Sequence, residues 1–120
     1  TGPAVCRRAE AGDTISFSNN AIQSRRHMEY HSLAKSKADR HMDPFIIDVD
    51  ATEDQDFVLS SHEGEEFIYV LRGRMEISYG KNTYLLNEGD SIYYDSIVPH
   101  HVHGYRGEAA QILAVVYTPA

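Results

Sequence analysis

The sequence predicts an all-β fold, a sandwich or barrel of short strands. Val, Ile, Tyr and Phe recur in short runs, and Gly, Asp, Asn and Pro separate these runs. Outside the N-terminal third, no 12-residue segment keeps the apolar period of a helix. The length of 120 residues is that of one domain, and 42% hydrophobic and 24% charged residues are ordinary for a globular protein.

Ten strands are expected in order along the chain. They are Thr14–Ser18, His27–Leu33, Phe45–Val49, Phe57–Ser61, Glu66–Arg72, Arg74–Tyr79, Thr83–Leu86, Ser91–Tyr94, His101–Tyr105 and Gln111–Tyr117. Three short connections read as tight turns because Gly and Asn tolerate positive φ. Hairpins are predicted at Gly73 and at the segments 79–83 and 87–90.

The composition excludes several classes of protein. The single cysteine, Cys6, rules out an intramolecular disulfide framework. The chain has no run of about 18 apolar residues, so no membrane span is predicted. The first residues lack the basic-then-apolar pattern of a secretion signal, so a cytoplasmic location is expected.

The charge is unevenly distributed. The net charge is −7, which argues against nucleic-acid binding over the whole surface. Residues 1–41 carry +3 and residues 42–120 carry −10. Because the chain lacks an initiator Met, we expect a piece of a longer protein. Residues 1–41 would be an N-terminal arm, a strand pair or a linker from a missing domain, and residues 42–120 the barrel.

Two segments carry the residues with metal-binding chemistry. His62 and Glu66 flank a glycine turn, so an imidazole and a carboxylate can converge there. About 35 residues later, the segment 98–103 brings three further histidines to the start of a strand. Two imidazoles and one carboxylate form a facial triad, which suits a divalent transition metal with open positions. These ligand types leave the metal open among Fe, Mn, Ni, Zn and Co.

The spacing of these residues resembles the two motifs of the cupin family. His62-x3-Glu66-x6-Gly73 is similar to the first motif, and Gly89-Asp90-x9-His100 is similar to the second. The resemblance covers roughly residues 43–118. It implies a cupin-type double-stranded β-helix, or jelly-roll barrel, usually a homodimer, with a metal or small ligand inside. It also implies that His62, Glu66 and His100 are the metal ligands.

The remaining histidines of the second segment receive a different prediction. The cupin motif places its ligand directly after a proline, which favours His100, the residue that follows Pro99. Side chains alternate along a strand, so His101 and His103 would share the opposite face. We expect them at the surface or the rim of the barrel.

A narrower resemblance concerns three strings of the sequence. They are Pro44-Phe-Ile-Ile, the stretch from His62 to Gly73 and the stretch from Leu86 to Tyr94. They look like the C-terminal effector-sensing cupin of XRE-type helix-turn-helix transcriptional regulators. This implies a small-molecule-sensing domain that does not itself bind nucleic acid, with DNA contacted through a missing N-terminal domain.

A second resemblance supports an alternative function. The order His62, Glu66, His100 is similar to the iron ligands in the cupin of hydroxypropylphosphonate epoxidases. The alternative is therefore a mononuclear metal-dependent oxygenase, epoxidase or isomerase acting on a small polar molecule. A third reading is a stand-alone binding protein with an empty or water-filled barrel. No residue is assigned as catalytic.

Three further residues are candidate ligand-binding residues. Ser60 stands where the usual first cupin motif has another histidine, and strand alternation places it on the face of His62. Tyr30, in the context Met28-Glu-Tyr30-His, resembles a substrate-contacting tyrosine of the epoxidases. Tyr94 is one of the strand tyrosines that could line the cavity.

Overall fold

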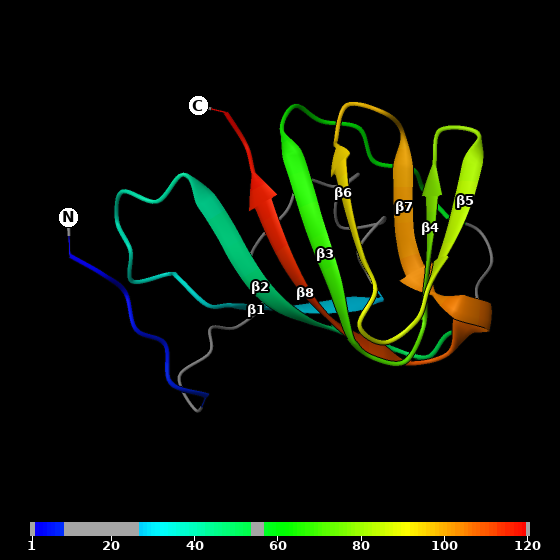
Figure 1. The fold of residues 1–120 in the computed structure, drawn as a ribbon, viewed down its shortest axis with the longest axis horizontal. Coiled ribbons are helices and arrows are strands. Elements are labelled where there is room, and N and C mark those ends of the chain that lie inside the picture. The colour runs from blue at the N-terminus through cyan, green and yellow to red at the C-terminus, as the bar shows by residue number, and fades with distance from the viewer. Residues whose placement is uncertain (1, 9–26, 54–56, 120) are drawn as a thin grey trace.

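The chain forms two antiparallel β-sheets that face each other. The computed structural model describes residues 2–8, 27–53 and 57–119, and in these ranges the chain forms eight strands and the short 3-10 helix η2. The elements are β1 (Met28–Ser32), β2 (Met42–Val49), β3 (Glu65–Arg72), β4 (Met75–Tyr79), β5 (Asn82–Leu86), β6 (Ser91–Asp95), β7 (His100–Gly104), η2 (Tyr105–Gly107) and β8 (Ala110–Tyr117). One sheet has the order β1-β2-β8-β3-β6 and the other the order β5-β4-β7 (Figure 1). The all-β prediction is confirmed.

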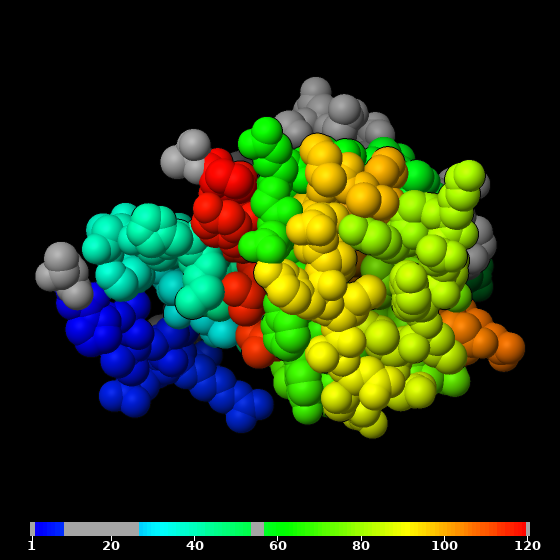
Figure 2. Space-filling model, turned by 45° about the horizontal axis from the view of Figure 1, so that its top comes forward, coloured from blue at the N-terminus to red at the C-terminus, as the bar shows by residue number. Residues whose placement is uncertain are grey.

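Strands that are distant in sequence pair within the larger sheet. The C-terminal strand β8 lies between β2 and β3, with Ile112 opposite both Ile47 and Val70. Figure 2 shows the red atoms of β8 beside the green atoms of β3 on the surface. The first and last strands of the segment 42–120, β2 and β8, therefore pair within one sheet.

The core lies between the two sheets because side chains alternate between the faces of a strand. On β3, Glu66, Ile68 and Val70 are buried, whereas the residues between them are more exposed. On the facing sheet, Met75 and Ile77 of β4 are completely buried. Glu66 is therefore a carboxylate on an otherwise apolar inner face.

Two of the predicted turns connect the sheets and do not form hairpins. The turn at Gly73 leads from β3 in the larger sheet to β4 in the smaller one, and the turn at residues 87–90 leads from β5 back to β6. Only the segment 79–83 closes a hairpin, between β4 and β5. Gly73 has a φ of 79°, and a Cβ there would lie 2.7 Å from the Ala109 carbonyl oxygen. The prediction of positive φ was right, but the hairpin predictions at Gly73 and at residues 87–90 were wrong.

The segment Phe57–Ser61 is not a strand. It makes one isolated antiparallel bridge, between Ser60 and His100. The predicted strand Thr14–Ser18 lies outside the described residues. The other eight predicted strands are present, with ends that differ by up to three residues.

Strand β1 extends the larger sheet at its edge, where Tyr30 lies opposite Ile47 of β2. The sheet therefore includes residues N-terminal to position 42. The proposed division of the chain at residue 41 stays a prediction. Within the described residues, there is no helix with the length and hydrophobicity of a transmembrane span.

Candidate metal centre

Three side chains converge inside one end of the barrel. Glu66 comes from β3, His100 begins β7 and His62 lies in the loop before β3. The Nε2 atom of His62 lies 3.0 Å from Glu66 Oε1, and the Nε2 atom of His100 lies 3.6 Å from the same oxygen. One ligand atom from each residue lies within 4.8 Å of the other two, as a shared metal ion requires.

Backbone hydrogen bonds hold the His62 loop against the neighbouring strands. The amide of Ser60 donates to the His100 carbonyl, and the amide of His100 donates back to Ser60. The amide of His62 donates to the Ser96 carbonyl at 3.0 Å. Gly64 makes the turn between His62 and Glu66 with a φ of 114°, and a Cβ at this position would lie 1.9 Å from the Tyr117 carbonyl oxygen. A glycine is therefore required here for both backbone conformation and space.

The ring orientations of both histidines fit a cation at this point. His100 Nδ1 lies 2.8 Å from the Val98 carbonyl oxygen, and His62 Nδ1 lies 3.2 Å from the Glu63 carbonyl oxygen. Since a carbonyl only accepts, each Nδ1 carries the hydrogen, and in a neutral ring Nε2 carries the lone pair. Two lone pairs then face an anionic oxygen. Either a proton on each Nε2 or a metal ion among the three atoms relieves this repulsion, so the donor set fits a divalent transition metal.

Glu66 is ionised despite its burial. Burial by itself raises the pKa of this carboxyl. Hydrogen bonds from His100 and His62, when their Nε2 atoms carry protons, and from Tyr94 outweigh this effect and hold the pKa of Glu66 well below its ordinary value. The carboxylate of Glu66 is therefore a negatively charged candidate ligand beside the two imidazoles.

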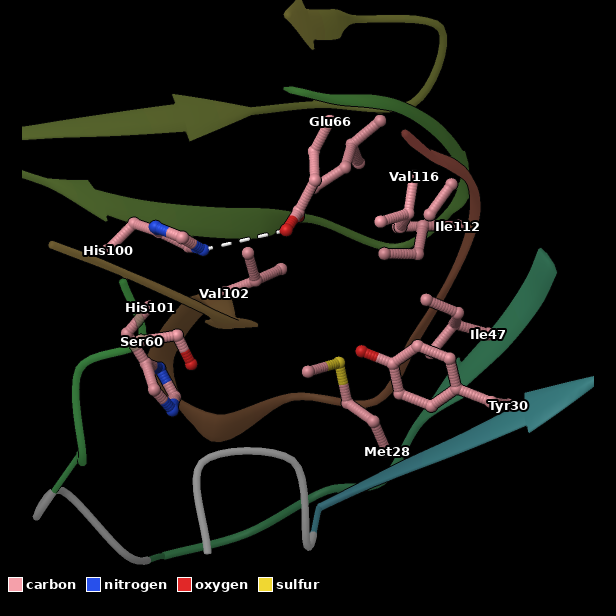
Figure 3. Close-up of a pocket in the computed structure, with 12 residues that line it drawn as sticks. Met28, Tyr30, Ile47, Ser60, Glu66, His100, His101, Val102, Ile112 and Val116 are labelled. Atoms are coloured by element: carbon pink, nitrogen blue, oxygen red, sulfur yellow. Dashed lines mark ion pairs between the residues drawn. The ribbon is translucent and has the colours of Figure 1, made fainter. Parts of the chain in front are cut away.

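A small cavity extends from this cluster into the barrel. Its volume is about 30 Å³, room for roughly two water molecules. Figure 3 shows Glu66 and His100 pointing toward each other at one side, with Met28 and Tyr30 across from them. Aliphatic side chains form much of the remaining wall, namely those of Ile47, Ile68, Val102, Ile112, Ala114 and Val116.

The three candidate ligand-binding residues occupy different positions. Ser60 and Tyr30 line the cavity. Tyr94 lies beside it, directly opposite Glu66 in the strand register, and its hydroxyl donates to Glu66 Oε2 at 2.5 Å. Contact of any of the three with a ligand stays a prediction.

The placement of His101 and His103 at the surface was wrong. Both residues are only 4% exposed. Strand alternation correctly puts them on the face opposite His100, but the ring of Phe57 stacks on both, at 4.4 and 3.9 Å between centroids. The ring of His27 stacks on His101 as well.

His101 also lines the cavity, beside Ser60 (Figure 3). The sequence analysis missed this wall residue. A signal was present, because His101 directly follows a predicted ligand at the start of a strand, where the barrel opens.

Comparisons with known proteins agree with this geometry. The model of the cupin domain family matches residues 49–116, more than half of the chain. This match supports the predicted jelly-roll barrel.

Two kinds of known protein are similar to the chain. It is 31% identical over 93 residues to (S)-2-hydroxypropylphosphonic acid epoxidase of Streptomyces wedmorensis, which covers 72% of this chain and 46% of the relative. The chain therefore spans about half the length of that curated relative. A solved structure of the FeII form of this epoxidase, HppE, in complex with substrate has a TM-score of 0.76 at 25% identity, over 97% of this chain and 61% of that one. A solved HTH_3 family transcriptional regulator from Vibrio cholerae has a TM-score of 0.65 at 26% identity, over 78% of this chain and 52% of that one.

Proposed function

Because the chain belongs to the cupin family, we propose that it is a metal-binding domain that senses a small molecule for an XRE-family transcriptional regulator. The observation that carries the proposal is the convergence of His62 Nε2, His100 Nε2 and Glu66 Oε1. Glu66 and His100 of this cluster also line a mostly apolar cavity. A sensing domain needs a site with limited access to solvent, and Glu66 and His100 are both buried.

The residues around the cavity have separate roles in this proposal. His62, Glu66 and His100 hold the metal, which supplies positive charge and open coordination positions for an oxygen or nitrogen of the ligand. The hydroxyls of Ser60 and Tyr30 hydrogen-bond the polar part of the ligand. The aliphatic wall contacts its apolar part and excludes water.

The regulatory role has its own support. The similarity to an HTH_3 family regulator covers 78% of this chain, and the +3 charge of residues 1–41 suits a connection to a DNA-binding domain. We propose that the chain acts in the cytoplasm as a homodimer, and that ligand binding changes how the dimer presents its DNA-binding domains. The upstream reading frame tests this role. We expect it to encode a helix-turn-helix domain in the same polypeptide, and a gene product that starts at Thr1 would refute the regulatory role.

The metal site is tested by metal analysis of protein purified without an affinity tag. We expect close to one divalent transition metal ion per chain in the wild type and a strong loss in His62→Ala. His31→Ala is the matched control, because His31 pairs with Asp48 away from the cavity. If wild type and His62→Ala carry the same trace of metal, the cluster is not a metal site.

A second candidate function is metal-dependent oxidation of a small polar molecule. The specific observation that favours it is the 31% identity to an epoxidase over 72% of this chain. The test is anaerobic loading with Fe(II), followed by oxygen and candidate substrates that include (S)-2-hydroxypropylphosphonate. Substrate-dependent oxygen consumption supports the enzyme. No turnover and no spectral change across the panel would leave the sensing function as the better proposal.

A further inference from the structure

The two oxygens of Glu66 have different surroundings. Oε1 faces the two histidines, at 3.0 Å from His62 Nε2 and 3.6 Å from His100 Nε2. Oε2 accepts a 2.5 Å hydrogen bond from the Tyr94 hydroxyl. The Ser96 hydroxyl also donates to Oε1, at 3.4 Å. The carboxylate is therefore oriented before any metal binds, with Oε1 toward the histidines and Oε2 toward the Tyr94 hydroxyl.

Packing holds the Tyr94 ring in place. Tyr94 is 6% exposed and lies on β6 directly opposite Glu66 on β3. Its ring centroid lies 5.0 Å from that of His100 and 5.3 Å from that of Tyr79. Since one side chain contacts two of the three candidate ligands, Tyr94 can set their relative orientation.

We propose that Tyr94 is a positioning residue that restricts Glu66 to binding the metal through Oε1 alone. This inference rests on the proposed metal site at His62, Glu66 and His100. With Oε2 bound to Tyr94, the protein supplies three donor atoms instead of four. A six-coordinate metal then keeps three open positions, enough for a chelating ligand and a further small molecule. Tyr94 acts on the ligand through Glu66 in this arrangement.

A purely structural role for Tyr94 predicts different results. Loss of the hydroxyl would then change the free energy of unfolding but leave the coordination of the metal unchanged. Loss of a hydrogen bond that orients a metal ligand typically weakens metal binding by about 10–100-fold. Metal affinity and the visible spectrum of bound Co(II) therefore distinguish the two roles.

The experiment is a Co(II) titration of the tag-free domain, followed by visible absorption. We expect Tyr94→Phe to bind Co(II) with a Kd raised about 10–100-fold. Its spectrum should also change, because a released Oε2 lets Glu66 bind through both oxygens. Tyr79→Phe is the matched control. It removes the hydroxyl that donates to the Asp95 carbonyl in the same aromatic cluster, and it should keep the wild-type Kd and spectrum.

A crystal structure of the Co(II)-loaded wild type provides a measurement that does not depend on how well the variants fold. We expect one Glu66 oxygen on the metal and the other still bonded to Tyr94. A Glu66 that binds through both oxygens, or a Tyr94→Phe variant with the wild-type Kd and spectrum, overturns the role of Tyr94 and leaves the metal site standing. A wild type that binds no Co(II) overturns both proposals.

Discussion

Strand β7 carries histidines on both faces, and the two sets are arranged differently. On the inner face, His100 and the neighbouring His62 direct their Nε2 atoms at one carboxylate oxygen of Glu66. On the outer face, the contacts form a line, with His101 Nδ1 3.0 Å from His103 Nδ1 and His103 Nε2 2.8 Å from Glu76 Oε1. His101 also reaches the wall of the cavity. One set converges on a point and the other forms a chain.

The difference shows why histidine content alone does not identify a metal site. In the outer chain, His103 Nε2 donates to the Glu76 carboxylate, so its Nδ1 accepts from His101 Nδ1 in the neutral rings. Protons already satisfy both of these contacts. In the inner cluster, both Nδ1 atoms are bonded to carbonyl oxygens, and the lone pairs of both rings face the same anion. Only the inner set requires a cation.

The first prediction compares the same substitution in the two sets of histidines, at His100 of the inner cluster and at His103 of the outer chain. We expect His100→Gln to raise the Kd for Co(II) by about 100-fold or more, since even loss of a supporting residue costs about 10–100-fold. His103→Gln should stay within about threefold of the wild type because His103 contacts Glu76. Titration of the tag-free variants with Co(II) provides both values. Equal losses in the two variants would contradict the separation of the clusters.

The second prediction concerns pH. Imidazole must lose a proton to bind a metal, and an ordinary histidine titrates near pH ~6.5. The pKa of Glu66 is held below its ordinary value, so this carboxylate stays charged as the pH falls through the histidine range. We expect the affinity for Co(II) to fall as the pH is lowered from 7.5 to 5.5, because protons compete with the metal for the imidazole nitrogens.

Calorimetric titrations in buffers of different ionisation enthalpy would detect the protons released on metal binding. An affinity that is flat over this range and falls only below pH ~4.5, where ordinary glutamates titrate, would contradict the assignment of two histidine ligands.

The sequence was sufficient to predict the inner cluster but not the outer chain. His62 and Glu66 are four residues apart across a glycine turn, and the resemblance to the cupin motif assigns the ligand to His100, directly after Pro99. Motif spacing therefore carries most of that prediction. The burial of His101 and His103 depends on Phe57 and Glu76, which are at least 25 residues away in sequence. Alternation identifies the face of a strand on which a side chain lies, but not what covers that face.

The turns show the same limit. Gly73 was correctly expected at a position of positive φ. Turn residues encode local backbone angles, but the partner of the next strand depends on packing of the whole barrel. The connection from β3 to β4 was therefore predicted to be a hairpin, although the two strands belong to different sheets.

The third prediction tests the outer chain through stability. Glu76→Ala removes the acceptor of a histidine whose side chain is 5% exposed, and a buried polar group left without its partner costs about 1–3 kcal/mol. Glu108→Ala is the matched control, because it breaks the exposed ion pair with Arg74 and should cost less than about 1 kcal/mol. Urea unfolding of the metal-free proteins measures both. Equal losses would mean that the buried contact stabilises the protein no more than a surface ion pair.

The last prediction has the smallest expected effect. It tests whether the stacking of Phe57 on the outer chain influences metal binding. Phe57 stacks on His103 with 14° between the ring planes, and an aromatic pair contributes about 0.5–1.5 kcal/mol beyond the area that it buries. We expect Phe57→Leu to lower the free energy of unfolding by about that amount more than Phe67→Leu, which removes the same atoms from the outer face of β3. Because Phe57 covers the chain and not the inner cluster, its loss should leave the Kd for Co(II) unchanged. A Phe57→Leu variant that loses metal as strongly as His100→Gln would show that the two faces of β7 act as one site.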